Sequence, residues 1–254
     1  MSPGWTEVVI DRPLTLPASK LALYGTLEIA HVTLTLLAGE APLGGQDHRL
    51  DLGLGYGVTD LLTVGAQYAF AIHDFEIKGP LTLFGAYSLL SKSKLTIGAS
   101  ADLTIDIGKS ATYETLHAGL GVRFQLAPTI ALFTGGTPVS FGGVASEMPM
   151  AGSVLGQHLA IGLNSNAPIT FDIPVGLGIQ ASPQAFLWAN TSVAHLGFSN
   201  ASNLYLFKDY IPLNVGLNFA VDKHLDLNAF LTLPDLKESK FDLLFAGIGV
   251  RYYN

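Results

Sequence analysis

Apolar and polar residues alternate one by one along most of this chain. Between residues 95 and 107 the apolar residues occupy odd positions, and small or acidic residues occupy even positions. The stretches 49–58 and 115–126 repeat this pattern. Because successive side chains of a β-strand point to opposite faces, the alternation predicts strands with one apolar face and one polar face.

The connections between these stretches alternate in length. Short ones, typical of tight turns, are at residues 59–60, 91–93, 127–128, 182–183 and 222–223. Longer ones are at residues 38–46, 73–78, 108–113, 140–168, 197–208 and 234–240. An antiparallel up-and-down barrel with tight periplasmic turns and longer outer loops has this arrangement, and it places both termini in the periplasm.

Counting between the connections predicts twelve strands. They span residues 20–34, 48–58, 62–72, 80–90, 94–107, 115–126, 129–139, 169–180, 185–196, 210–221, 225–233 and 241–253. A further hairpin within residues 140–168 would raise the count to fourteen. Residues 1–19 carry Pro3, Pro13 and Pro17, which favour an extended segment over a central strand. We expect this segment to hang in the periplasm or to fill the lumen as a plug, and residues 20–254 to form the barrel.

Residue chemistry decides which face of the barrel is outside. Charged residues make up 13% of the 254 positions, against roughly 25% in a typical soluble protein. The polar face is mostly Gly, Thr, Ser, Asn and Ala, whereas the apolar face is Leu, Ile and Val with Tyr56, Tyr87 and Tyr252 near strand ends. These features predict an all-β transmembrane barrel with lipid outside and a polar lumen inside. A soluble β-sandwich or a large lipocalin-like barrel is the alternative.

Two segments resemble those of known bacterial outer-membrane β-barrels of the porin and channel kind. Residues 244–254 resemble their C-terminal assembly signal, although the chain ends in Tyr253 and Asn254 where such signals usually end in Phe. Residues 55–66 resemble their periplasmic turns. The resemblance implies residence in the lipid bilayer of a bacterial outer membrane. Residues 1–5 lack the basic and apolar regions of a secretory signal, so we expect Met1 to be an added start residue on a mature chain.

Several inward charges fall at similar heights when strand positions are counted from the periplasmic side. This group, which we name the acidic belt, comprises Glu28, Arg49, Asp51, Asp102, His117 and Asp172. A ring of charged side chains predicts a constriction that selects ions or small polar solutes. The alternative is an internal network, such as Arg49 with Glu28, that fixes the barrel and leaves no path.

A second inward group lies near the periplasmic rim and comprises Lys94, Arg123, Asp226 and Arg251. We interpret it as solvated rim charge rather than as a binding site. With Asp106 added, the two groups hold six acids and four bases, which predicts a mildly cation-favouring lumen. The net charge of −7 and the absence of a basic patch disfavour nucleic acid as a partner.

Catalysis is a third possibility, because some outer-membrane barrels are lipid hydrolases with a Ser-His pair on the lipid-facing wall. His31, His195, Ser192 and Thr191 are the candidates here. Ser192 and His195 are three residues apart, which predicts opposite faces on a regular strand. No paired-His metal spacing, phosphate loop or nucleotide fingerprint occurs, and cysteine is absent, so we expect no metal and no cofactor.

The sequence therefore predicts a monomeric or weakly oligomeric outer-membrane pore for passive diffusion of small hydrophilic solutes or ions. A closed structural or interaction barrel with a sealed lumen is the main alternative, and a lipid hydrolase is the third. The openness of the lumen separates the first two.

Overall fold

The computed structural model describes residues 5–34, 43–72, 80–106, 114–134, 159–162, 169–198, 204–206, 212–233 and 243–254. One 3-10 turn, η1 (Val9–Asp11), comes before the strands. The strands are β1 (Leu21–Leu34), β2 (Leu43–Thr59), β3 (Leu62–Ala71), β4 (Pro80–Ser91), β5 (Leu95–Asp106), β6 (Glu114–Ala127), β7 (Ile130–Thr134), β8 (Leu159–Gly162), β9 (Ile169–Gln180), β10 (Ala185–Phe198), β11 (Leu204–Leu206), β12 (Leu213–Ala220), β13 (Leu225–Leu233) and β14 (Leu243–Tyr253). Within these residues no helix is long and apolar enough to span a membrane.

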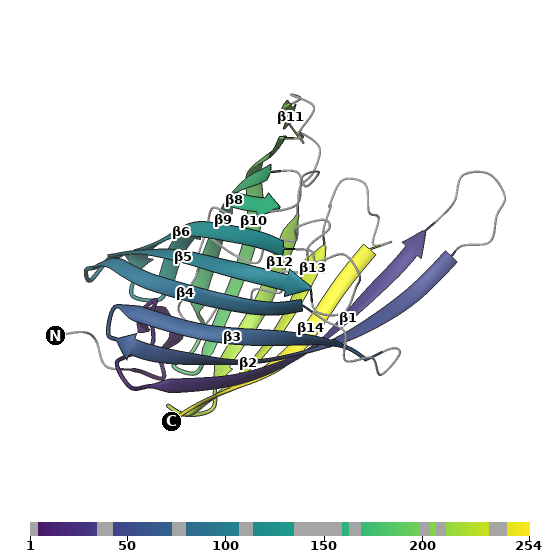
Figure 1. Ribbon diagram of the computed structural model, residues 1–254. Helices are drawn as coiled ribbons and strands as arrows, with labels where there is room; N and C mark the ends of the chain where they lie inside the picture. The colour runs from purple at the N-terminus through teal and green to yellow at the C-terminus, as the bar shows by residue number, and fades with distance from the viewer. Residues whose placement is uncertain are drawn as a thin grey trace.

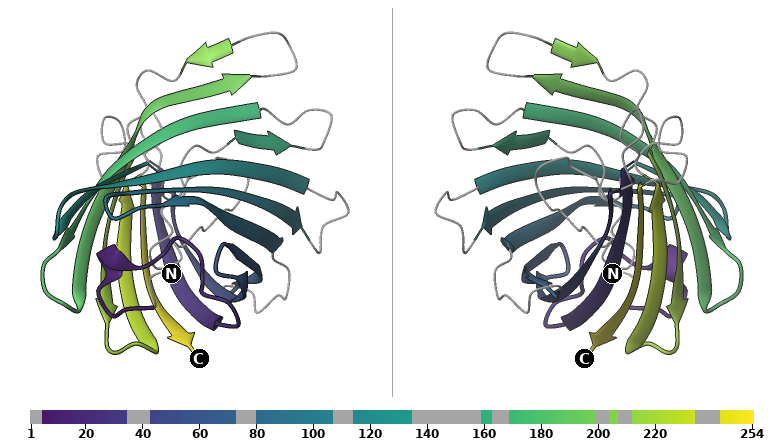
Figure 2. Two further views of the ribbon diagram at one scale, coloured as in Figure 1. Left: turned by 90° about the vertical axis from the view of Figure 1, so that its left-hand side faces the viewer. Right: turned by 90° about the vertical axis from the view of Figure 1, so that its right-hand side faces the viewer.

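The sheet closes on itself, because β14 pairs antiparallel with β1 from Ala22 opposite Tyr253 to Val32 opposite Leu243. Figures 1 and 2 show the strands curving around a common interior. Closure gives each position around the barrel two hydrogen-bonded neighbours and removes the exposed edges that an open sheet would present to lipid.

The fourteen strand segments fill twelve positions around the barrel. Both β7 and β8 pair with β6 on one side and with β9 on the other, so together they occupy one strand position. In the same way, β11 and β12 both pair with β10. Residues 159–162 therefore complete the seventh strand position and add no hairpin, which settles the count at twelve.

The barrel is inside out relative to a soluble protein, as the alternation predicts. On β2, Leu52, Leu54 and Tyr56 are each more than 40% exposed, whereas Asp51, directly before Leu52, is 1% exposed. On β1, Thr26 is buried and Leu23 is exposed. Large apolar side chains on the outer surface and polar side chains on the inner surface are the distribution that a lipid environment requires.

Several predicted boundaries differ from the structure. The seventh strand was expected at residues 129–139; β7 spans Ile130–Thr134, residues 135–139 lie outside the described residues, and β8 (Leu159–Gly162) shares its position in the barrel. The expected connections at 38–46 and 197–208 are partly strand, because β2 begins at Leu43 and β11 lies at Leu204–Leu206. Periodicity misses these ends because strand pairing continues beyond the residues that contact lipid, where alternation is no longer required.

Candidate functional site: the barrel lumen

Three residues of the predicted acidic belt form one ion-pair cluster on the inner face. The register pairs Glu28 of β1 with Arg49 of β2, and Asp51 follows two residues later on the same face. An Arg49 terminal nitrogen lies 3.0 Å from Glu28 Oε2, and Arg49 Nε lies 3.0 Å from Asp51 Oδ1. The single guanidinium thus forms ion pairs with both carboxylates, including that of Asp51, whose side chain is almost fully buried.

The rest of the belt is only partly described. Asp102 on β5 is buried and stands opposite Phe84 and the backbone of His117 in the strand pairing. The side chains of His117, Asp172 and Asp106 lie outside the described residues. A complete ring at one height stays a prediction.

The charges expected at a solvated periplasmic rim divide into two kinds. Lys94 is exposed, as expected. Arg123, Asp226 and Arg251 are buried, with 9%, 3% and 3% exposure, so the prediction of solvated side chains is wrong for these three. Their burial has a specific cause, which is the N-terminal segment comprising residues 5–17.

Arg12 of this segment is fully buried and binds Asp226 through two guanidinium nitrogens, one of them 2.9 Å from Asp226 Oδ1. The Tyr253 hydroxyl donates a further hydrogen bond of 2.8 Å to the same carboxylate. The guanidinium carbon lies 4.8 Å from the ring centre of Trp5, whose ring centre is 4.6 Å from that of Tyr253. This arrangement combines a bidentate ion pair with cation–π contacts.

Backbone groups of the N-terminal segment also bind the inner wall. The Ile10 amide donates to Gln180 Oε1 at 3.0 Å, and the Leu16 amide donates to Thr63 Oγ1 at 2.7 Å. In the opposite sense, Arg123 donates to the Arg12 carbonyl at 2.7 Å. These contacts satisfy segment backbone groups that would otherwise be buried without a partner.

A second feature that periodicity does not reveal is an apolar sector of the inner wall. Phe133, Phe186 and Trp188 are buried on the inner face and pack with Val9 and Ile10 of the segment. The expected lining of Gly, Thr and Ser therefore holds for only part of the lumen.

Each of these rings packs against a glycine of a neighbouring strand. A Cβ atom added at Gly176 would lie 2.1 Å from the Phe133 ring, and one added at Gly216 would lie 2.4 Å from the Trp188 ring. Glycine lets the ring lie flat on the strand backbone. The sequence indicates this apolar sector at residues 185–190. There, large apolar residues stand at even as well as odd positions, so both faces of the strand are apolar.

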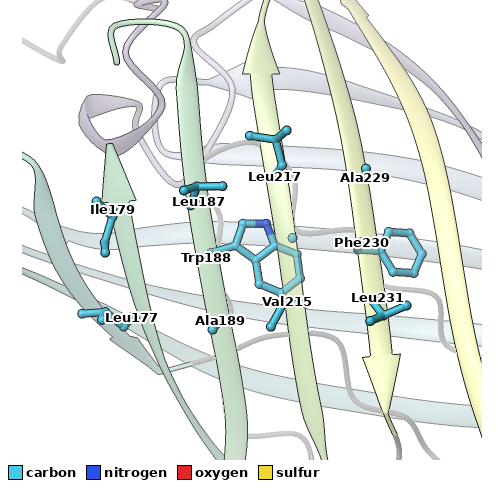
Figure 3. Close-up of a pocket in the computed structure, with 11 residues that line it drawn as sticks. Leu177, Ile179, Leu187, Trp188, Ala189, Val215, Leu217, Ala229, Phe230 and Leu231 are labelled. Atoms are coloured by element: carbon cyan, nitrogen blue, oxygen red, sulfur yellow. The ribbon is translucent and has the colours of Figure 1, made fainter. Parts of the chain in front are cut away.

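An apolar depression of about 510 Å³ lies over β9, β10, β12 and β13 (Figure 3). Its walls include Leu177, Ile179 and Leu187, which are 40–46% exposed on the lipid-facing surface. The small side chains of Ala189 and Ala229 line it together with these larger ones. It therefore belongs to the lipid contact surface and not to the lumen.

The hydrolase candidates gain no support from the geometry. The pairing of β10 with β9 shifts between Ser192 and Ala194, so the regular spacing that predicts opposite faces for Ser192 and His195 does not apply. The side chains of His31 and His195 lie outside the described residues. No group of three His, Cys, Asp or Glu that could hold a metal ion occurs in the described part of the chain.

A closed barrel with an apolar outer face and a polar inner face defines the class of transmembrane β-barrels of the bacterial outer membrane. The chain has the fold of the porins and channels of that membrane. The KdgM porin, solved in complex with disordered oligogalacturonate, has 10% identity and a TM-score of 0.57, covering 91% of this chain and 98% of its own.

Two further solved structures share the fold. The COG4313 outer membrane channel from Pseudomonas putida F1 has 13% identity and a TM-score of 0.56, covering 94% of this chain and 97% of its own. The NanC porin has 7% identity and a TM-score of 0.50, covering 91% and 98%. No family model matches the chain, and no curated protein matches it.

Proposed function

We propose that this chain is a pore for passive diffusion of small hydrophilic solutes or ions across the outer membrane. The observation that carries the proposal is the buried polar inner face, on which Glu28, Arg49, Asp51 and Asp102 stand inside a barrel whose outer face is apolar. Polar side chains that line the interior of a membrane barrel are the common feature of water-filled pores. The likeness to porins and a channel supports the same conclusion at the level of the fold.

We further propose a mild preference for cations. Among the residues that the structure describes in the outer part of the lumen, Glu28, Asp51 and Asp102 carry three carboxylates and Arg49 one guanidinium, which gives a net charge of −2. An excess of one sign inside a narrow low-dielectric passage raises the local concentration of the opposite ion.

A sealed structural barrel is the second candidate, and a specific observation favours it. Arg49 is tied to both Glu28 and Asp51, and residues 5–17 occupy interior space at the periplasmic end. Planar bilayers distinguish the two candidates. We expect single-channel steps from the wild-type protein in its open state, whereas a sealed barrel gives no steps under any condition.

Reversal potentials across a salt gradient test the selectivity. We expect a cation preference that is stronger at 0.01 M than at 0.1 M salt, because the Debye length falls from ~30 Å to ~10 Å over this range. Asp102→Asn should reduce the preference. The matched control Asp222→Asn removes the same charge from an exposed turn outside the lumen and should leave the preference unchanged. Equal effects of the two variants, or none, would contradict a selective role for Asp102.

A further inference from the structure

We infer that residues 5–17 are a built-in plug of the periplasmic half of the lumen, held by a latch at Arg12, and that the channel conducts when this latch is released. The inference rests on the proposed pore function and adds its regulation. A chain end with no role in the lumen would hang in water with its apolar side chains exposed. In this segment Val9, Ile10, Arg12, Leu14 and Leu16 are each at most 3% exposed.

The segment crosses the interior of the barrel and does not follow one wall. Its hydrogen bonds reach Thr63 on β3, Arg123 on β6, Gln180 on β9 and Asp226 on β13. In the closed ring these strands hold the third, sixth, eighth and eleventh of twelve positions. A peptide bound to walls on all sides of a ring obstructs the passage, and Figure 2 shows the purple segment inside the ring of strands.

Arg12 is the point at which the segment is fixed most strongly. Its guanidinium binds Asp226, and Nε donates 2.6 Å to the Thr6 carbonyl, so one side chain ties the wall and the segment itself. Arg12 also carries the carbonyl that accepts from Arg123. Breaking this one cluster removes contacts to β6, β13 and the segment together.

A tight turn connects the plug to β1 and leaves the rest of the barrel independent of it. The Lys20 amide donates to the Pro17 carbonyl at 3.1 Å, and the Ser19 amide donates to the Gly57 carbonyl at 2.8 Å. Among the residues that the structure describes, Ser19 is the one non-glycine residue with a positive φ, 66°. Strand pairing between β14 and β1 begins beyond this turn, at Ala22, so residues 5–17 can leave without breaking the closure of the sheet.

The wall offers a substitution that displaces the plug without changing any charge. A Cβ atom added at Gly57 would lie 2.0 Å from the Pro17 carbonyl oxygen and 2.7 Å from the Leu16 carbonyl oxygen. Gly57→Ala therefore requires the segment backbone to move. Gly85→Ala is the matched control, because an added Cβ there meets no atom closer than 3.9 Å.

The converse change locks the plug in place. The Leu16 amide already lies 2.7 Å from the Thr63 hydroxyl, and the chain contains no cysteine, so Leu16→Cys with Thr63→Cys gives one possible disulfide. Conductance of the same protein is then recorded oxidised and after addition of a reductant.

A readout that needs no conduction reports the position of the segment. With Trp188→Phe, Trp5 is the sole tryptophan, and it packs against Tyr253 in the docked segment. We expect iodide to quench Trp5 at least twofold more effectively in Gly57→Ala and Arg12→Ala than in Gly85→Ala.

We expect open probability to rise at least tenfold in Gly57→Ala and Arg12→Ala, to stay at the wild-type level in Gly85→Ala, and to fall to zero in the oxidised disulfide variant. Equal conductance in the locked and released proteins overturns the plug and leaves the pore. Unchanged Trp5 quenching in both release variants overturns the docking. Increased quenching with silence in every variant overturns both the plug and the proposed pore.

Discussion

Two arginines bind carboxylates on the inside of the barrel, and they differ in where their partners come from. Arg49 binds Asp51 of its own strand and Glu28 of the adjacent strand, and its side chain is 19% exposed. Arg12 binds Asp226, which lies 214 residues later in the chain, and the two side chains are 0% and 4% exposed.

The difference in burial has an energetic consequence. Loss of one ion pair costs little stability when the remaining charge still contacts water or a second partner. The cost is much larger when that charge is fully buried. The Arg49 cluster has two acids for one base, so removing one acid leaves the guanidinium paired. The Arg12 cluster has one acid, so removing either partner leaves the other charge with neutral hydrogen-bond partners such as the Tyr253 hydroxyl or the Thr6 carbonyl.

Arg12→Ala should give the largest effect. We expect the free energy of unfolding, measured by urea titration in lipid vesicles, to fall by about 3–5 kcal/mol, because release of the segment removes the buried ion pair with Asp226 and the burial of Val9 and Ile10 together. A fall below about 1 kcal/mol would mean that the ion pair of Arg12 contributes no more than an exposed one, and the contrast between the two arginines would be wrong.

An arginine on the opposite side of the wall gives a reference value for the same method. Leu120 is 41% exposed on the lipid-facing surface, and Leu120→Arg should cost about 2–4 kcal/mol near the membrane midplane. Gly119→Arg, at the preceding position and on the polar face, should lower the free energy of unfolding by less and should alter conductance. Equal costs would contradict the assignment of the two faces.

Tyr253→Phe should show how much the hydroxyl of Tyr253 contributes to the stability of the Arg12–Asp226 cluster. The Tyr253 hydroxyl lies 2.8 Å from Asp226 Oδ2, and a hydrogen bond to a charged group contributes about 1.5–3 kcal/mol. We expect a loss in that range with Arg12 still docked, read from unchanged Trp5 quenching. Undocking in this variant would show that the ring hydroxyl, and not the ion pair, holds the segment.

Glu28→Gln should give the smallest effect. The amide oxygen still accepts from Arg49, and Arg49 keeps Asp51, so we expect a loss of about 0.5–1.5 kcal/mol in the same urea titration. A loss comparable to that of Arg12→Ala would remove the distinction between the two clusters.

The sequence predicts the Arg49 cluster, whose residues are near one another in the chain, better than the Arg12–Asp226 cluster, for a physical reason. Alternation assigns Glu28, Arg49 and Asp51 to one face, and neighbouring strands in a meander pair with each other, so their contact follows from position along the chain. The same logic predicts β9 and β13 with the observed ends, at residues 169–180 and 225–233.

Burial of Arg123, Asp226 and Arg251 does not follow from their own strands. It depends on Arg12 and its neighbours, which lie in a segment without periodicity, and strand patterns contain no information about where such a segment docks. Alternation does not predict the apolar sector of the inner wall for a related reason. Phe133 and Trp188 occupy inward positions that only glycines on the neighbouring strands make available, and alternation does not register such cross-strand pairs.

The distance in sequence between Arg12 and Asp226 also sets an order of events during assembly. Residues 5–17 are synthesised before every strand, yet their docking site is built from β6, β9, β13 and the Tyr253 ring on β14. The site exists only after β14 has closed the ring onto β1. A protease added during refolding should therefore cut residues 5–17 in every unclosed intermediate and spare them in the finished barrel, so resistance of this segment to cleavage reports completed closure.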